Sequence, residues 1–353
     1  MVLLVLVGLL MASYGTAYVA SDDVRYLTRA GIEETGILRA RRSLAKMAAD
    51  SATDPAVRAQ LRLVLDARDF AAGLGLEAKE TYTTYADVGR DTLLLVLSAS
   101  PKNCLCAHLW KYPIVGRIPY KGFFDPEAAR REAARLEAKG LDIYLRPSGA
   151  FSTLGWFNDP LLSTALTGDS VELAATVFHE IAHNTLYMKS ATPFNESFAQ
   201  LVGYRAAEAF FRQRGDSAAA EQAAHRWEDE VVLGGFYTEL AGRLDSLYRT
   251  VRDSAAIDSG RAEVGRWARD QLEGPVAARL RTYRIGKLSD RPVNNARIIA
   301  ARIYRTHLDL FERWYELQGR GVGQSVAALR DLMKGAEGDS AFVRLEESVS
   351  GKK

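Results

Sequence analysis

The stretch Phe178-His179-Glu180-Ile181-Ala182-His183, followed by Glu196 thirteen positions after its last residue, decides how this chain of 353 residues is organised. Side chains four positions apart on an α-helix differ by only about 40° around the axis, so two histidines at that spacing can bind one ion. A zinc ion with two histidine ligands and one carboxylate keeps an open position for water. The sequence therefore predicts one Zn²⁺ per chain, held by His179, His183 and Glu196.

Glu180 lies between the two histidines, where it can reach a metal-bound water more easily than the ion itself. A carboxylate in that position is typical of the general base of a zinc hydrolase. Two alternatives stay open at this point: a surface pair of histidines held by salt bridges, and a metal site that serves structure alone. A purely structural site has no use for Glu180, so the pattern favours catalysis.

The flanking sequence predicts two helices that bring the three ligands together. Asp169-Ser170-Val171-Glu172 is a helix-capping signature, and apolar residues recur at helical spacing from there to about Lys189. A second helix is expected to begin with Thr192 as its N-cap and Pro193 as its first residue. A tight reversal between the two helices would return Glu196 to the metal.

Around these residues the chain resembles the bacterial "predicted aminopeptidase" family, a gluzincin-type group. The resemblance rests first on Phe178–Tyr187 and Phe194–Ala199, and it extends in order from about Tyr26 to beyond Tyr304. Further matching stretches are Val115-Gly116, Pro119-Tyr120, Gly122, Ser152–Leu162 and Asn294-Asn295-Ala296. The resemblance implies a membrane-associated zinc peptidase, with aminopeptidase as the activity attached to the family.

The chain departs from related proteins in two ways. Family members often carry a lipobox cysteine near the N-terminus, whereas the first cysteine here is Cys104. The chain also lacks the Gly-x-Met-Glu-Asn motif with which well-known zinc aminopeptidases hold the free amine of the substrate. The sequence therefore leaves open whether cleavage is exo- or endoproteolytic.

The N-terminal segment carries the signal for location. Met1 to Ser21 contains no charged side chain, and its apolar run is followed by small residues around Gly15-Thr16-Ala17. This composition predicts a signal peptide or a membrane anchor, with a buried core helix as the alternative. The folded part is therefore expected outside the cytoplasm, in the periplasm or anchored to the membrane and facing outward.

Composition limits the classes of partner. Hydrophobic residues make up 48% of the chain, which is enough for a large core, and the formal net charge is only +2. No basic patch is interleaved with aromatic residues, so nucleic acid is not an expected partner. Charged helical stretches such as Glu228-Asp229-Glu230 are expected to form solvated faces.

Cys104 and Cys106 alternate along the chain and lead to His108, so on a strand they would share one face. Three outcomes stay open: a second, soft metal site, two unpaired thiols, and a local disulfide after export. His225 and His307 lie in amphipathic helical stretches and are assigned no role.

The predicted fold class is α+β, mainly helical and zincin-like, with a small sheet before the zinc helix and a helical lobe after it. Helices are expected from Ser21 to about Leu74 and from Pro126 to Lys139. The predicted strands are Leu93–Leu97, Ile114–Tyr120 and Leu141–Arg146.

No Pro/Gly/Ser-rich linker divides the chain. Residues 1–21 are therefore expected to be a separate signal or anchor, and residues 22–353 to form one domain. Its two lobes would cover about 22–190, which includes the zinc helix, and 191–353.

This layout predicts how a peptide or protein substrate binds. The extended segment Leu141–Phe157 could pair with a peptide laid across the metal. Zinc would polarise the scissile carbonyl, and Glu180 would take a proton from the attacking water and pass it to the leaving amine. Tyr304 is the candidate donor to the oxyanion, with a simple packing role as the alternative.

A second class of function stays open beside the enzyme. The same residues could form an extracytoplasmic binding or assembly module that zinc stabilises and that hydrolyses nothing. The presence of Glu180 favours the peptidase.

Overall fold

The computed structural model describes residues 2–112, 116–149 and 160–351. Helices make up 65% and strands 9%, which confirms a mainly helical α+β fold. All described strands precede the helix that carries the two histidines, and only helices follow it. A small sheet region before this helix and a helical region after it are therefore present, as the sequence predicts.

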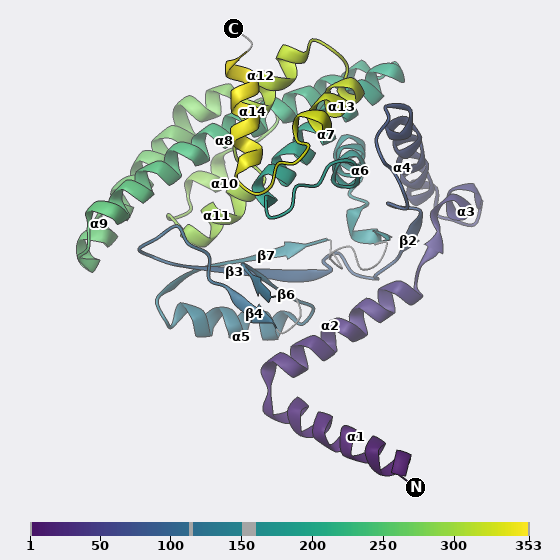
Figure 1. Cartoon of the computed structure of the whole chain (residues 1–353), viewed down its shortest axis with the longest axis vertical. Helices are drawn as coiled ribbons and strands as arrows, with labels where there is room; N and C mark the ends of the chain where they lie inside the picture. Colours follow the sequence, from purple (N-terminus) through teal and green to yellow (C-terminus); the bar gives the residue numbers. More distant parts are fainter. Residues whose placement is uncertain (1, 113–115, 150–159, 352–353) are drawn as a thin grey trace.

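The helices alternate with short strands only in the first half of the chain (Figure 1). The described α-helices are α1 Val2–Ala20, α2 Asp22–Arg39, α3 Leu44–Ala49, α4 Pro55–Gly73, α5 Pro126–Glu137, α6 Ser170–Thr185, α7 Thr192–Gln213, α8 Ser217–Thr250, α9 Ser254–Gln271, α10 Gly286–Ser289, α11 Asn295–Ile303, α12 Leu308–Gln318, α13 Val322–Leu332 and α14 Ser340–Ser350. Three short turns of other helix types are η1 Ser163–Ala165, η2 Leu272–Val276 and η3 Ala277–Arg279.

The described strands form three small sheets. Their bounds are β1 Arg42–Ser43, β2 Thr84–Ala86, β3 Leu94–Pro101, β4 Trp110–Tyr112, β5 Gly116–Ile118, β6 Lys121–Phe123, β7 Leu141–Ser148 and β8 Leu161–Leu162. The order β6-β3-β7 is antiparallel throughout, and β7 pairs with the whole of β3. Helix α5 covers one face of this sheet and α11 packs on the other (Figure 1).

Helix α6 forms the centre of the largest hydrophobic cluster. Its N-cap is Asp169, whose carboxylate accepts hydrogen bonds from the backbone of Val171 and Glu172, as the capping signature predicts. One side of the helix is buried, including Phe178 and Ile181, and packs against α4 and α7. The helix thus presents its two histidines from a rigid, fully packed support.

Helix α7 lies unusually close to α6 at Gly203. A Cβ atom at this position would lie 2.9 Å from the carbonyl oxygen of Ala175 and 3.4 Å from the Cβ of His179. Contacts of 2.9 Å are shorter than carbon and oxygen tolerate, so a glycine is needed for the two helices to approach this far.

Asn195 holds the turn between α6 and α7. Its side chain accepts a hydrogen bond from the Met188 amide and donates one to the Met188 carbonyl, both at 2.8 Å. The turn begins earlier than the sequence predicts, because α6 ends at Thr185 rather than near Lys189. The N-cap prediction was also wrong by one residue, since the cap of α7 is Ala191, without a side-chain hydrogen bond.

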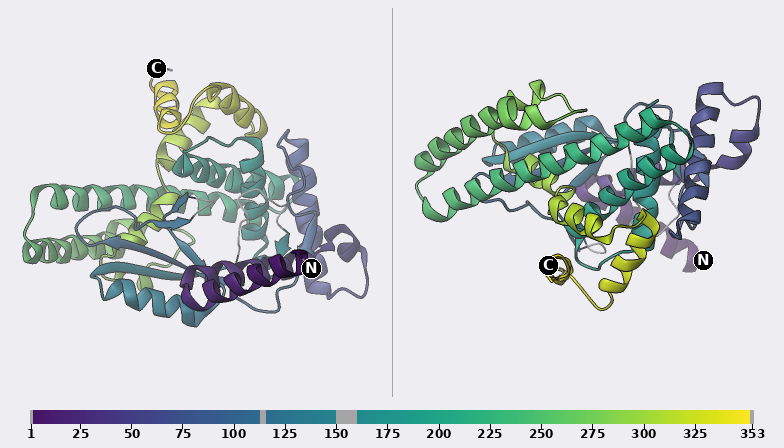
Figure 2. Two further views of the ribbon diagram at one scale, coloured as in Figure 1. Left: turned by 60° about the horizontal axis from the view of Figure 1, so that its bottom comes forward. Right: turned by 90° about the horizontal axis from the view of Figure 1, so that it is seen from above.

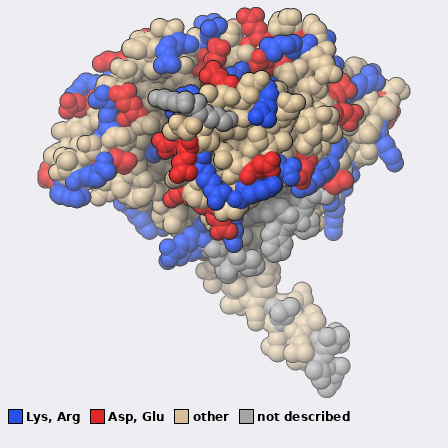
Figure 3. Space-filling model, turned by 45° about the horizontal axis from the view of Figure 1, so that its top comes forward, with Lys and Arg blue, Asp and Glu red and all other residues tan. Residues whose placement is uncertain are grey.

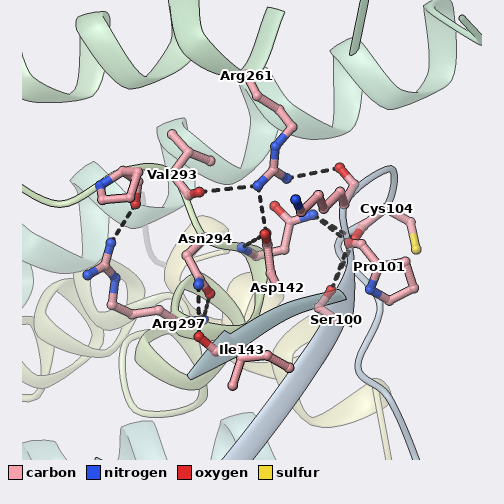
Figure 4. Close-up of polar contacts among 12 residues, drawn as sticks. Ser100, Pro101, Cys104, Asp142, Ile143, Arg261, Val293, Asn294 and Arg297 are labelled. Carbon is pink, nitrogen blue, oxygen red and sulfur yellow. Dashed lines mark hydrogen bonds and ion pairs between the residues drawn. The ribbon is translucent and has the colours of Figure 1, made fainter. Parts of the chain in front are cut away.

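A buried polar hub joins the sheet to the helices (Figure 4). Arg261 of α9 donates to Asp142 of β7 at 2.6 Å, and the Asn295 amide donates to the same carboxylate at 2.7 Å. The Asn295 side chain donates to the carbonyls of Pro101 and Cys104 and accepts from Tyr248. The hub therefore fixes α11 on the sheet, which explains the role of the Asn294-Asn295 pair.

Changing Asp142 to asparagine should lower the free energy of unfolding by roughly 3 kcal/mol, because it leaves the buried Arg261 cation uncompensated. Urea denaturation would measure this. The matched control is Asp309→Asn, which breaks an exposed pair with Arg313 and should cost less than about 1 kcal/mol. Equal losses in the two variants would contradict a structural role for the hub.

Helix α1 stands away from the body as a stalk without charged side chains (Figure 3). Its apolar side chains are exposed, with Leu9 at 61% and Val19 at 79%, so the alternative of a buried core helix was wrong. Within the described residues, no single helix is long and apolar enough to cross a membrane, although α1 and α2 satisfy the criteria together as a bent pair. An N-terminal signal sequence meets the same criteria.

Several other expectations need correction. The region from Ser21 to Leu74, predicted to be helical, is interrupted by β1. Of the strand predicted at Ile114–Tyr120, the structure shows β5, Gly116–Ile118, and residues 113–115 lie outside the described part. The run Glu228-Asp229-Glu230 is not a solvated face, because Asp229 and Glu230 are 0% and 1% exposed. They lie on α8, which runs beside α9 as a long antiparallel pair (Figure 2).

Candidate metal centre

The structure brings His179, His183 and Glu196 together. The Nε2 atoms of the two histidines on α6 are 3.2 Å apart. One carboxylate oxygen of Glu196 on α7 lies 3.3 Å from Nε2 of His179 and 3.7 Å from Nε2 of His183. Among the described residues, this is the one group of three or more potential ligands that could hold an ion.

These distances fit a tetrahedral zinc site. Bonds of about 2.0–2.1 Å in a tetrahedron place neighbouring ligand atoms about 3.3 Å apart. The three ligand atoms lie 3.2, 3.3 and 3.7 Å from one another. Two imidazole nitrogens that face each other, with a carboxylate beside both, form a donor set suited to a divalent metal.

The electrostatics of the ligands agree with their proximity. Burial alone would raise the pKa of Glu196, but its contacts with His179 and His183 outweigh burial and lower the pKa to about 2. Burial opposes protonation of His183, but its contact with Glu196 raises the pKa overall. The Nδ1 atom of His183 is buried without a hydrogen-bond partner, so the Nε2 atom is the one that faces the shared site.

Glu180 follows His179 on α6 and is half-buried. No hydrogen bond or ion pair engages its carboxylate in the described part of the chain. It lies near enough to the site to influence the pKa of both His183 and Tyr304. An unengaged carboxylate beside the ligands is available to accept a proton from water.

Tyr304 also lies at the centre, with its ring centroid 6.4 Å from that of His179. Burial raises its pKa to about 12 and Glu196 adds to the rise, so the phenol stays protonated at neutral pH. A protonated phenol beside a metal centre can donate a hydrogen bond to an oxygen of a ligand.

Two neighbours of Tyr304 fix its position. The Thr306 amide donates to Oγ of Ser197, the residue after Glu196, at 3.2 Å. Arg305 forms a salt bridge with the buried Glu230 at 2.6 Å.

The burial of the acidic pair on α8 is explained by its partners. Glu230 is paired with Arg305, and Asp229 accepts hydrogen bonds from the backbone of residues 281–283.

Two residues near the centre were missed by the sequence analysis as site residues. Burial raises the pKa of Tyr120 and Glu196 adds to the rise, whereas Arg146 opposes it. Arg146 opposes the rise at Tyr304 in the same way. The alternation of β7 places Arg146 on the same face of the strand as Asp142, but the sequence alone does not show which groups that face meets.

The second metal site is not supported. Cys104 and Cys106 form a disulfide with each other. Of the three alternatives for these cysteines, the structure therefore has the local disulfide. His108 packs edge-on against Trp110. His225 lies 2.7 Å from a guanidinium nitrogen of Arg281, and His307 packs on Phe342; neither belongs to the group of His179, His183 and Glu196.

The expected peptide-binding segment is described only in part. Strand β7 covers Leu141–Ser148 and is the outer strand of its sheet among the described strands. Residues 150–159 lie outside the described part, so the Ser152–Leu162 stretch is described only from Pro160 onward. A separate cavity of about 630 Å³ lies between residues 186–189 and the α13 region, and none of the candidate site residues lines it.

Comparison with known proteins gives one family. A search of curated proteins and a search of solved structures each return no match. The family model described as "Putative aminopeptidase" matches residues 25–340, which is most of the chain and includes every candidate site residue. The chain therefore belongs to this family, whose description indicates peptide hydrolysis.

Proposed function

We propose that the protein is a zinc metallopeptidase whose metal is held by His179, His183 and Glu196. The observation that carries this proposal is the approach of three ligand atoms to within 3.2–3.7 Å of one another, beside the unengaged carboxylate of Glu180. A binding module would need the three ligands but has no use for an additional free carboxylate. The family description supports the same class of reaction.

The proposed mechanism assigns a task to each residue. Zinc bound by the three ligands would supply a Lewis acid that polarises a peptide carbonyl and lowers the pKa of a water molecule. Glu180 accepts the proton of that water and then donates it to the amine that leaves. Tyr304 donates a hydrogen bond to the carbonyl oxygen as negative charge develops there.

Strand β7 would orient the peptide. Its outer edge offers backbone groups to which an extended chain can pair, and this pairing would hold a carbonyl at the centre. The zincin-like layout thus assigns substrate orientation to the sheet and chemistry to the two helices α6 and α7.

We also propose that the protein acts outside the cytoplasm and associates with the membrane through its N-terminal segment. An exposed helix with no charged side chain is unfavourable in water, because burial of each apolar side chain is worth roughly 1.5–3 kcal/mol. A bilayer, or removal as a signal peptide, would resolve this exposure. A disulfide such as Cys104–Cys106 persists in an oxidising compartment, which supports the same location.

A peptide-library digest tests the function. Zinc-loaded protein should release fragments detectable by mass spectrometry, and a chelator should abolish them because the water is no longer activated. The masses would show whether cleavage starts at a terminus or within the peptide. Absence of cleavage across a broad library would contradict the peptidase and favour a binding or assembly module.

A further inference from the structure

The turn between α11 and α12 brings Tyr304 to the candidate metal centre. Tyr304 is the C-cap of α11, and its ring lies beside that of His179, with the two ring centroids 6.4 Å apart. The next helix starts at Leu308, so residues 305–307 alone join the two helices. His307 in this turn has a φ of +53°, in the left-handed region that residues other than glycine rarely adopt. Such a conformation persists only where neighbouring contacts determine it.

Glu230 of α8 holds this turn through its side chain. Glu230 is 1% exposed; one carboxylate oxygen lies 2.6 Å from Nε of Arg305, and the other accepts a hydrogen bond from Nη2 of Arg305 at 2.9 Å. A two-point contact between a planar guanidinium and a carboxylate fixes direction as well as distance. Tyr283 donates a further hydrogen bond to Glu230 at 2.7 Å. The residue directly after Tyr304 is therefore fixed in orientation.

Two backbone contacts hold the same turn from other elements. The Thr306 amide donates to Oγ of Ser197 at 3.2 Å, and Ser197 lies on α7, the helix that carries a candidate ligand. On α8, one helical turn after the buried glutamate, a Cβ atom at Gly234 would lie 3.3 Å from the carbonyl oxygen of Arg305. The turn thus packs against both α7 and α8, which fixes the end of α11 where Tyr304 lies.

Glu230 has no direct part in the centre. It does not belong to the group of described residues that could hold an ion. A buried ion pair often stabilises a fold no more than apolar packing of the same volume would, so stability alone does not account for the pair of Glu230 with Arg305. Such a pair does fix the direction of a side chain. This matters next to a reacting group, because a misplacement of about 1 Å can cost about 10²-fold in rate.

We infer that Glu230 is a positioning residue of the proposed reaction: through Arg305 it holds Tyr304 where the peptide carbonyl gains negative charge. The inference rests on the proposed function and adds to it a residue outside the candidate ligand set. A hydrogen-bond donor stabilises a transition state best when it is fixed in place before the charge develops. Loss of Glu230 should therefore lower kcat and leave KM unchanged.

Peptide kinetics in four proteins test the coupling: the wild type, Glu230→Gln, Tyr304→Phe and the double variant. Glu230→Gln should lower kcat about ten- to a hundredfold, because the phenol is no longer held in place. In the Tyr304→Phe background the same change should have almost no further effect, since the hydroxyl that it positions is absent. Glu230→Asp keeps the charge and should restore part of the rate.

Binding of a phosphinic tripeptide measures the same placement without turnover. This probe has a tetrahedral phosphorus with a charged oxygen in place of the scissile carbonyl, so it resembles the transition state. Calorimetric titration of the zinc-loaded proteins should show similar losses of affinity in Glu230→Gln and Tyr304→Phe, at equal zinc content. If Glu230→Gln does not fold, Arg305→Lys replaces it, because lysine keeps the charge and loses the two-point contact.

The matched control is Glu312→Gln. Glu312 lies on α12, forms a salt bridge with Arg205 and accepts a hydrogen bond from Nε1 of Trp227, so its partners are of the same kind as those of Glu230. Neither of these partners belongs to the turn that follows Tyr304. Glu312→Gln should lower the melting temperature but leave kcat and the affinity for the probe unchanged.

A folded Glu230→Gln variant with the kcat and probe affinity of the wild type would overturn the inference. Equal losses of kcat in the wild-type and Tyr304→Phe backgrounds would also overturn it, because Glu230 would then act elsewhere. Full turnover by Tyr304→Phe would refute the role of Tyr304, and this inference with it, but retain the peptidase. Absence of cleavage by the wild type, together with probe binding that depends on both Glu230 and Tyr304, would refute the peptidase and retain the positioning.

Discussion

Replacing Glu180 with glutamine should lower the rate of peptide hydrolysis by about 10²–10⁴-fold, because a positioned general base contributes a factor of this size. Glutamine keeps the size and helix propensity of the side chain but cannot accept the proton. The side chain makes no hydrogen bond or ion pair within the described residues, so the fold should not change. Single-turnover assays with saturating peptide would measure the rate, and elemental analysis would measure the zinc.

The control for this variant is Glu221→Gln, which makes the same chemical change at an exposed position of α8. Its rate should equal that of the wild type. Glu180→Gln should also retain about one equivalent of zinc, since the residue is not a ligand in the proposed site. Undiminished hydrolysis by Glu180→Gln would disprove its role and require another base.

Removal of a metal ligand should have the second large effect. His183→Ala should lower the affinity for zinc by more than about 100-fold, because even second-shell changes cost about 10–100-fold. Glu196→Gln should also weaken binding, since it removes a charged oxygen that lies within 3.3 Å of His179 and 3.7 Å of His183. Competition with a fluorescent zinc chelator would measure the affinities, and hydrolysis should fall with the metal content.

His225→Ala is the matched control, because this histidine interacts with Arg281 rather than with the centre. It should keep the zinc affinity of the wild type. Circular dichroism should show native helicity in all three variants, since α6 is held by packing against α4 and α7. An unchanged zinc affinity in His183→Ala would exclude the proposed site.

The approach of His179, His183 and Glu196 to one another could be predicted, because it depends on residues that are close in sequence. The spacing of His179 and His183 fixes their relative direction on any helix, and the Asp169 cap fixes where that helix starts. Glu196 follows because the intervening segment is long enough only for a turn and the start of a new helix. These three expectations depend on residues that are close in sequence.

The end of α6 could not be predicted, because distant residues determine it. The Thr185 hydroxyl accepts a hydrogen bond from the Glu77 amide at 2.9 Å, across 108 positions of the sequence. The burial of Glu230 similarly depends on Arg305, and that of Asp229 on Thr282. From the sequence alone, a run of charged residues is predicted to be solvated, because partners more than fifty positions away cannot be recognised.

The close approach of α6 and α7 at Gly203 has a consequence for how this protein tolerates change. Gly203 lies two helical turns beyond Glu196, and its missing side chain sets the separation of the ligand-bearing helices. Any larger residue would push against the backbone at Ala175 and the base of His179. The centre is therefore vulnerable to a single added methyl group at a position that has no chemical role, and activity can be lost there without altering any functional group.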